Sequence, residues 1–146
     1  MTQANDMGYD VAYFGVDGMD GLLALEGFDT SLAEGAYLLT PFSADAQDEL
    51  TQNFVTKYVE KYGDTPNQFA ADAYDCVYAV YDACVANGIT ADMSAADIGT
   101  ALVSAFTGGY TYSGLTGSNM TWAATGEVSK DPMAVVIKDG AYASVA

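Results

Sequence analysis

The spacing of apolar residues changes period twice along the chain, and this change limits the possible folds more than any other feature. Between residues 44 and 106, apolar side chains recur every three or four residues, as they do in helices with one apolar face. Short apolar runs bounded by glycine, proline or aspartate lie on both sides of this region, which is typical of strands. The resulting order of elements, βαβααα followed by a β-rich end, predicts an α/β fold.

Strands are predicted at both ends of the chain. Near the start, Val11–Phe14 is expected to be a short buried strand, and Ala36–Thr40 a second one that Pro41 ends because proline cannot donate to a sheet. Near the end, 134–137 and 141–145 flank an Asp-Gly pair, which predicts a β-hairpin.

Three helices are predicted between these strands. Ser43 is expected to cap a helix over 44–62, a second helix should span 68–86, and a third should begin at the capping residue Ser94 and run through Phe106. Helical spacing assigns the second helix one buried face of apolar residues: Ala70, Ala73, Tyr74, Val77, Tyr81 and Cys84. After the third helix, glycine, serine and threonine alternate with aromatic residues, and Trp122 is expected to pack beneath irregular strands.

Charge and composition exclude several classes of function. Four lysines and no arginine or histidine stand against twenty acids, so the net charge is −16. Phosphate contacts need a basic surface, so nucleic acid is not expected as a partner, and anionic membrane surfaces are disfavoured for the same reason. The absence of histidine removes the commonest general base and the commonest zinc ligand. We therefore expect no metal and no cofactor.

The two cysteines are expected to be free thiols. Cys76 and Cys84 are eight residues apart in a predicted helix, which separates them by about 12 Å along its axis. A disulfide needs α-carbons within about 7 Å, so these two cannot pair in that helix. Both are predicted to be small buried residues.

The stretch YFGVDGMDG, residues 13–21, ends an apolar run with two aspartates on a glycine-rich loop. It lacks the alternating acids and distal glutamate of a calcium loop, and it lacks the lysine of a phosphate loop. Asp20 is predicted to cap a helix that begins near Gly21. Asp17 has no such role; it lies where a strand ends, which is where open α/β sheets bind ligands, and its carboxylate suits an ammonium group.

Several segments, taken in order, resemble one known family. They are YFGVDG at 13–18, EGAYLLTPF at 34–42, FVTKYVEKYG at 54–63, FAADAYDCVY at 69–78, GLTG at 114–117 and the Asp-Gly pair at 139–140. This order is similar to the later part of type I periplasmic binding proteins of the branched-chain amino-acid transporter group. No single segment is specific to that family, but their order and spacing together are.

The resemblance implies two Rossmann-like lobes that close on a small ligand. Residues 1–40 would belong to the C-terminal lobe, 43–130 to the N-terminal lobe and 133–146 to the C-terminal lobe again, with hinge crossings near 40–43 and 130–133. The ligand would contact Asp17, Gly18 and Met19, with Asp17 pairing with the α-ammonium group of an amino acid. Thr40, Pro41 and Phe42 would form part of the hinge.

The function that follows from the resemblance is that of an extracytoplasmic solute-binding component of an ABC transporter, either periplasmic or a cell-surface lipoprotein. Its partners would be a small polar ligand, expected to be an amino acid, and a membrane permease. A ligand-sensing receptor domain of the same fold is an alternative. A further alternative is an acidic α/β hydrolase that uses Asp17 and Asp20 as paired carboxylates, but the chain has no histidine and no G-x-S-x-G motif. We therefore expect a protein that is not an enzyme.

The start of the chain reads as the last turn of a helix, with Gly8 as its end. From this we expect the chain to be the C-terminal portion of a longer protein, without the signal segment and without the ligand-carboxylate groups of the other half. On its own it is expected either to self-associate or to be an incomplete part of a longer folded chain, and to bind ligand weakly.

Overall fold

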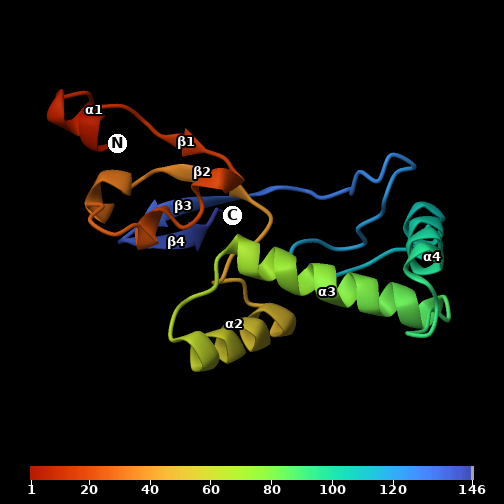
Figure 1. Cartoon of the computed structure of the whole chain (residues 1–146). Coiled ribbons are helices and arrows are strands. Elements are labelled where there is room, and N and C mark those ends of the chain that lie inside the picture. The colour runs from red at the N-terminus through yellow and green to blue at the C-terminus, as the bar shows by residue number, and fades with distance from the viewer. Residues whose placement is uncertain (146) are drawn as a thin grey trace. The chain divides into compact units, whose positions relative to one another are not determined.

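A computed structural model describes residues 1–145 (Figure 1). Its elements are, in order, α1 Thr2–Asp6, β1 Phe14–Gly15, the 3₁₀ turns η1 Asp17–Met19, η2 Leu22–Ala24 and η3 Thr30–Ala33, then β2 Tyr37–Thr40, α2 Glu49–Tyr62, α3 Gln68–Ala86, α4 Ala95–Thr107, β3 Met133–Lys138 and β4 Ala141–Ser144. None of the helices in the described part of the chain combines the length and apolar character needed to cross a membrane. The mixed strands and helices confirm the predicted α/β class.

The chain divides into two compact units. The first consists of Met1–Phe69 and the residues from Pro132 onward, and the second of Ala70–Asp131, so the boundary falls in the first turn of α3. The first unit contains the sheet and α2, whereas the second contains nearly all of α3, all of α4 and the irregular segment that follows. The assignment of residues to two lobes with hinge crossings near 40–43 and 130–133 stays a prediction.

The sheet of the first unit has the order β1-β2-β3-β4. β1 pairs with β2 in parallel, and the β2–β3 and β3–β4 pairs are antiparallel. Asp139 and Gly140 at the tip between β3 and β4 have φ of 53° and 75°, the conformation that a tight hairpin turn requires, so the predicted hairpin is confirmed. The buried core beneath the sheet is made of small and branched residues: Ala33, Ala36, Leu38, Val135 and Ile137.

The second unit has a smaller core where α3 and α4 meet the chain after Gly109. Phe106, Tyr110 and Trp122 form an aromatic cluster with ring centroids 4.7 to 5.9 Å apart. Two isolated bridges, Tyr112 with Met120 and Trp122 with Val128, are the irregular strands expected from the sequence. The packing role predicted for Trp122 is therefore confirmed.

Two predicted boundaries are wrong. The first strand begins at Phe14 rather than at Val11, and the side chains of Val11 and Phe14 are exposed, so the prediction that this strand is buried is also wrong. The helix expected from 44 begins at Glu49. Asp48, not Ser43, accepts the backbone N–H of Thr51 and caps it.

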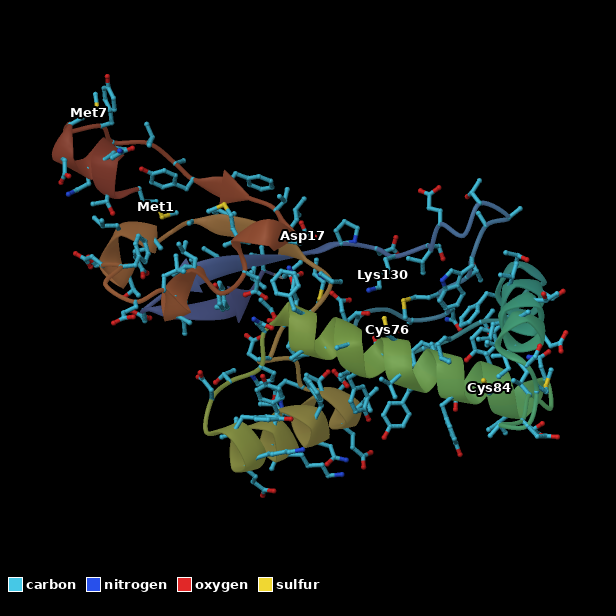
Figure 2. All side chains as sticks on the ribbon, in the orientation of Figure 1. Met1, Met7, Asp17, Cys76, Cys84 and Lys130 are labelled. Atoms are coloured by element: carbon cyan, nitrogen blue, oxygen red, sulfur yellow. The ribbon has the colours of Figure 1, made fainter. Side chains whose placement is uncertain are left out.

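The helix predicted over 68–86 is confirmed as α3, but the predicted buried face is wrong. The buried side is Ala71, Asp75, Ala79 and Ala83, which repeat every four residues. The side predicted to be buried is largely exposed, with Val77 67% and Tyr81 61% exposed. Cys76 is exposed and Cys84 half-buried on α3, and both are free thiols (Figure 2). The prediction of free thiols is confirmed, and the prediction that both are buried is wrong.

Candidate functional site

The loop after β1 carries Asp17 at its start. The Asp17 side chain, labelled in Figure 2, is exposed, and its Oδ1 accepts the backbone N–H of Gly18 at 2.9 Å. Ionised aspartate has about four acceptor positions, so this carboxylate keeps the capacity to bind a cationic group. Its backbone carbonyl, by contrast, is firmly held and accepts the Gln68 side-chain amide at 2.6 Å.

Gly18 and Met19 complete the 3₁₀ turn. Gly18 is exposed, and a Cβ added to it would meet no atom within 4 Å, so the space beside its backbone is open. Met19 is half-buried and packs against the core of the first unit, and its sulfur occupies the space where Gly15 lacks a side chain. Of the three predicted ligand contacts, Asp17 and Gly18 thus lie at the surface, while Met19 supports the loop from below.

Asp20 does not cap the turn that follows it, so that prediction is wrong. The turn η2 has Gly21 at its N-cap position, with no side-chain cap. Asp20 Oδ1 accepts the backbone N–H of Gly21 at 2.7 Å, and Oδ2 accepts the backbone N–H of Gln68 at 2.7 Å. Asp20 therefore satisfies a free N–H at the beginning of α3, a helix that starts 48 residues further along the chain.

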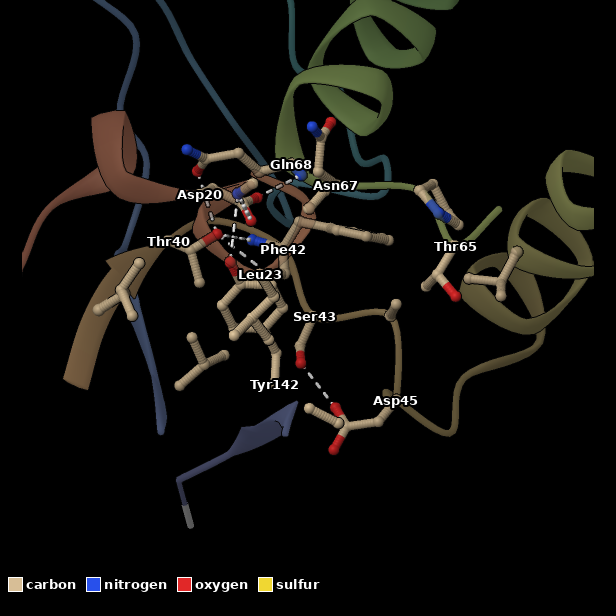
Figure 3. Close-up of a pocket in the computed structure, with 18 of the residues that line it drawn as sticks. Asp20, Leu23, Thr40, Phe42, Ser43, Asp45, Thr65, Asn67, Gln68 and Tyr142 are labelled. Carbon is tan, nitrogen blue, oxygen red and sulfur yellow. Dashed lines mark hydrogen bonds between the residues drawn. The ribbon is translucent and has the colours of Figure 1, made fainter. Parts of the chain in front are cut away.

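Gln68 is a residue that the sequence analysis missed. It is 1% exposed and its side chain bonds at both ends: Nε2 donates to the Asp17 carbonyl at 2.6 Å, and Oε1 accepts the Thr40 hydroxyl at 3.0 Å. Figure 3 places Gln68 together with Asp20 and Thr40. A polar residue directly after Thr65-Pro66-Asn67 was the available signal, but its partners lie 28 and 51 residues away, beyond the reach of any local pattern.

The three predicted hinge residues lie at the end of β2, with Thr40 as its last residue and Pro41 and Phe42 directly after it. Thr40 is buried, and its hydroxyl is shared between Gln68 and the Phe42 carbonyl, each at 3.0 Å, while it accepts the Phe42 N–H at 3.2 Å. Pro41 is half-buried and Phe42 is buried. The Phe42 ring packs edge-on against Phe54 of α2, with 6.0 Å between centroids. The turn after β2 is therefore held by both side-chain and backbone bonds.

A cavity of about 870 Å³ lies within the first unit, beside Gln68 (Figure 3). Acidic and hydroxyl groups at its wall include Asp20, Ser43, Asp45 and Tyr142. Burial, and next the negative charge of Asp20, raise the pKa of the Tyr142 phenol, so Tyr142 stays neutral and its oxygen accepts the Gly21 N–H at 3.2 Å. Asp17, Gly18 and Met19 are not among the residues that line this cavity.

The structure gives no support to a hydrolase that uses Asp17 and Asp20 as paired carboxylates. Both oxygens of Asp20 hold backbone N–H groups, so Asp20 is occupied by the fold rather than paired with Asp17 as an acid. Within residues 1–145 no cluster of three or more acidic or cysteine side chains is placed to hold a metal ion.

Comparison with known proteins gives one consistent result. The sequence pattern of the periplasmic binding protein family matches residues 1–141. Among solved structures, the leucine-binding protein LivK of Thermotoga maritima has a TM-score of 0.74 at 22% identity, over 99% of this chain. The branched-chain amino-acid transporter substrate-binding protein LivJ of Streptococcus pneumoniae, in complex with isoleucine, has a TM-score of 0.76 at 24% identity, over 96% of this chain.

A third similar structure is a solute-binding protein of an ABC transporter from R. palustris in complex with benzoate, with a TM-score of 0.74 at 16% identity, over 97% of this chain. The match covers 39%, 38% and 36% of the three proteins respectively, so this chain spans less than two-fifths of their length. A search of curated protein sequences gives no match.

Proposed function

The chain belongs to the periplasmic binding protein family, and from that premise we propose that it is part of an extracytoplasmic solute-binding protein of an ABC transporter. The family resemblance predicted from the sequence is confirmed, as is the fold. The family consists of binding proteins rather than enzymes, which agrees with the absence of histidine. We propose a periplasmic or cell-surface location, and a membrane permease as partner.

The ligand we propose is a small amino acid that lies between two lobes, with its ammonium group at Asp17. This proposal rests on Asp17, an exposed carboxylate close after the end of β1, which accepts the N–H of the adjacent Gly18. Relatives include proteins in complex with isoleucine, leucine and benzoate. An aromatic acid without an amine would be repelled by the Asp17 charge, whereas an ammonium group would form a charge-assisted hydrogen bond with it. This favours an amino acid.

A titration followed by amide NMR tests this proposal. Leucine added to the chain should shift the Gly18 and Met19 amide signals, and benzoate should not. Asp17→Asn should weaken leucine binding about tenfold or more, because a hydrogen bond to a charged group contributes about 1.5–3 kcal/mol. In a protein with both lobes, the loss should reach about 2–5 kcal/mol, the range for breaking a buried charge pair.

Asp64→Asn is the matched control. Asp64 is also exposed and also accepts the N–H of the next residue, at 3.1 Å, but it lines the cavity rather than the Asp17 loop. Leucine binding that survives Asp17→Asn and is lost in Asp64→Asn would move the ligand into the cavity and contradict the proposed site.

Self-association of the isolated chain is a second part of the proposal. Val77 and Tyr81 lie on the exposed side of α3 together with Cys76, and the segment 76–81 contains no charged residue. Large apolar surfaces of this kind are normally covered. Light scattering should therefore give a mass above 15.3 kDa for the chain studied alone. Val77→Asp should reduce that mass, and Val103→Asp, at an equally exposed position on α4, should not.

A further inference from the structure

Gln68 joins three segments of the first unit through one buried residue. Its backbone N–H donates to Asp20 in the loop after β1, its side-chain amide donates to the Asp17 carbonyl in the same loop, and its side-chain oxygen accepts the hydroxyl of Thr40 at the end of β2. Gln68 itself is the first residue of α3. The loop, the strand end and the helix start are therefore fixed to one another at a single point.

The chemistry of this point suits an amide. The group must donate to the Asp17 carbonyl and, at its other end, accept from the Thr40 hydroxyl, and a side-chain amide carries both a donor and an acceptor at neutral pH. An ionised carboxylate would place an acceptor 2.6 Å from another acceptor. An alkyl side chain would remove both of these bonds. The Asp17 carbonyl would keep only the Asp20 N–H of its own turn, and the Thr40 hydroxyl would keep only its bonds with Phe42, so the loop and the strand end would lose their side-chain link to α3.

The bonds of Gln68 also restrict the direction in which the Asp17 side chain points. Gly18 follows Asp17, and a glycine without a side chain does little to restrict the loop. The bond from Gln68 to the Asp17 carbonyl fixes the peptide that leads from Asp17 to Gly18, and the Asp20 bond fixes the other end of the turn. A binding group gains affinity when its direction is set before the ligand arrives.

We propose that Gln68 is a positioning residue for the ligand site at Asp17, and that it ties the site to the Thr40–Phe42 turn. This role rests on the proposed function, because it assumes that Asp17 contacts ligand. Binding at Asp17 then strengthens the same network that holds the end of β2, and any movement of that turn is transmitted to the Asp17 carbonyl through one side chain.

Hydrogen exchange tests the positioning role without a ligand. In Gln68→Met, a change close in size that removes both side-chain bonds, the amides of Met19 and Asp20 should exchange about tenfold faster, as expected when a hydrogen bond of ordinary strength is lost. The amides of Val136 and Ile137 in the hairpin should keep their rates. Gln52→Met is the control: Gln52 Nε2 also donates to a backbone carbonyl at 2.6 Å, but it is exposed and lies on α2.

Gln68→Glu adds a test by pH. When protonated, the substituted side chain again has a donor and an acceptor, so loop exchange, corrected for its intrinsic pH dependence, should approach that of the unmodified chain at low pH. It should rise as the carboxyl ionises. Unchanged Met19 and Asp20 exchange in both Gln68 variants would overturn the proposal, as would faster exchange throughout the first unit, because that would indicate a purely structural residue.

The leucine titration separates this inference from the proposed function. Gln68→Met should weaken leucine binding about tenfold while Gln52→Met leaves it unchanged. If leucine binds, depends on Asp17 and ignores Gln68→Met, the positioning role is wrong and the proposed function stands. If the unmodified chain shows no leucine shifts, the proposed function fails, and the exchange data alone decide whether Gln68 holds the loop.

Discussion

Asp75 in α3 and Asp17 in the loop after β1 are both aspartates whose side chains accept backbone N–H groups. Asp75 is 5% exposed and holds the N–H groups of Leu115 and Thr116, each at 2.8 Å, and the Thr116 hydroxyl at 2.7 Å. Asp17 is exposed and accepts one N–H from its own neighbour. The number of distant donors, rather than the presence of a bond, separates a carboxylate that fixes a loop from one that can receive a ligand.

The residues around Asp75 stabilise its charged carboxylate. The Tyr112 hydroxyl donates to it at 3.4 Å, and burial together with the Asp75 charge raises the pKa of Tyr112 well above its ordinary value, so this donor keeps its proton. Gly114 passes so close that an added Cβ would lie 2.2 Å from Asp75 Oδ1. Four donors and one missing side chain thus stabilise the carboxylate inside the second unit.

The largest predicted effect comes from Asp75→Asn. The variant keeps one oxygen and turns the other into a donor that faces a buried N–H group, that of Leu115 or that of Thr116. We expect a loss of about 3 kcal/mol, since an unsatisfied buried group costs about 1–3 kcal/mol and the remaining bonds lose their charged acceptor. Urea unfolding followed by the fluorescence of Trp122, the single tryptophan, measures it. Asp72→Asn is the control on the same helix: it breaks the 2.7 Å salt bridge to Lys130, which is partly exposed, and should cost about 1 kcal/mol or less.

Gly114→Ala should have the next largest effect. The added methyl group would overlap with Asp75 and with the Tyr112 ring, and moving them should cost about 1–3 kcal/mol, the usual range for overpacking. Gly99→Ala provides a control of opposite sign, because Gly99 lies inside α4 with open space around it, and alanine there should stabilise by about 0.5–1 kcal/mol. Equal stability of both variants would mean that the loop does not depend on close approach to Asp75.

The helix that carries Asp75 also shows which parts of the structure could be predicted from the sequence. The limits of α3 followed from its pattern and from Asn87-Gly88, but its buried side did not. α3 is apolar on nearly every side, so periodicity could not choose between the Val77 side and the Ala79 side. The side with Ala79 is buried because Leu115 and Thr116, some forty residues further along the chain, bond to Asp75 on that side.

The candidate site could likewise be predicted from the sequence only in part. The position of Asp17 after a strand follows from local pattern, whereas Gln68 and the true partner of Asp20 do not, because their bonds span 28 to 51 residues. The start of α2 shows the same limit. Ser43 and Asp48 are both good capping residues, and Ser43 instead donates to Asp45, whose carboxylate also accepts the Ser144 hydroxyl from 99 residues away.

Asp20→Ala should lower the free energy of unfolding by less than Asp75→Asn and by more than Asp17→Asn, since Asp20 resembles each of these aspartates in part. It is half-buried and holds one N–H of its neighbour and one N–H at the start of α3. Removing a carboxylate that caps a helix costs about 0.5–2 kcal/mol. Urea unfolding followed by circular dichroism should report this loss. Because the Asp20 bond also holds one end of the turn that carries Asp17, leucine binding should fall, but by less than in Asp17→Asn. A loss of binding as large as that in Asp17→Asn would mean that Asp20 contacts the ligand.

Asp45 provides a smaller effect that depends on pH. Hydrogen bonds from Ser144, and next from Ser43, lower the pKa of Asp45. A lowered pKa means that the stabilisation is present above the ordinary value of about 3.9 and is lost as pH falls through the lowered one. As the pH is lowered, the amide signal of Ser144 should therefore shift with a midpoint below about pH 3.9, the unperturbed pKa of aspartate. In Asp45→Asn this shift should be absent. A midpoint at or above the ordinary value would contradict the bonding described.

The smallest effect is expected for the stability of Asp17→Asn. The Asp17 side chain is exposed and accepts the Gly18 N–H, and asparagine retains an oxygen that can accept the same N–H. The carbonyl that Gln68 holds belongs to the backbone and is unchanged by the substitution. We therefore expect the free energy of unfolding to change by about 0.5 kcal/mol or less, as is usual for surface substitutions, while leucine binding falls about tenfold or more. Urea unfolding and the NMR titration, carried out on the same sample, measure both quantities. A stability loss approaching that of Asp75→Asn would show that Asp17 holds the fold as Asp75 does, and the carboxylate would then no longer be available to a ligand.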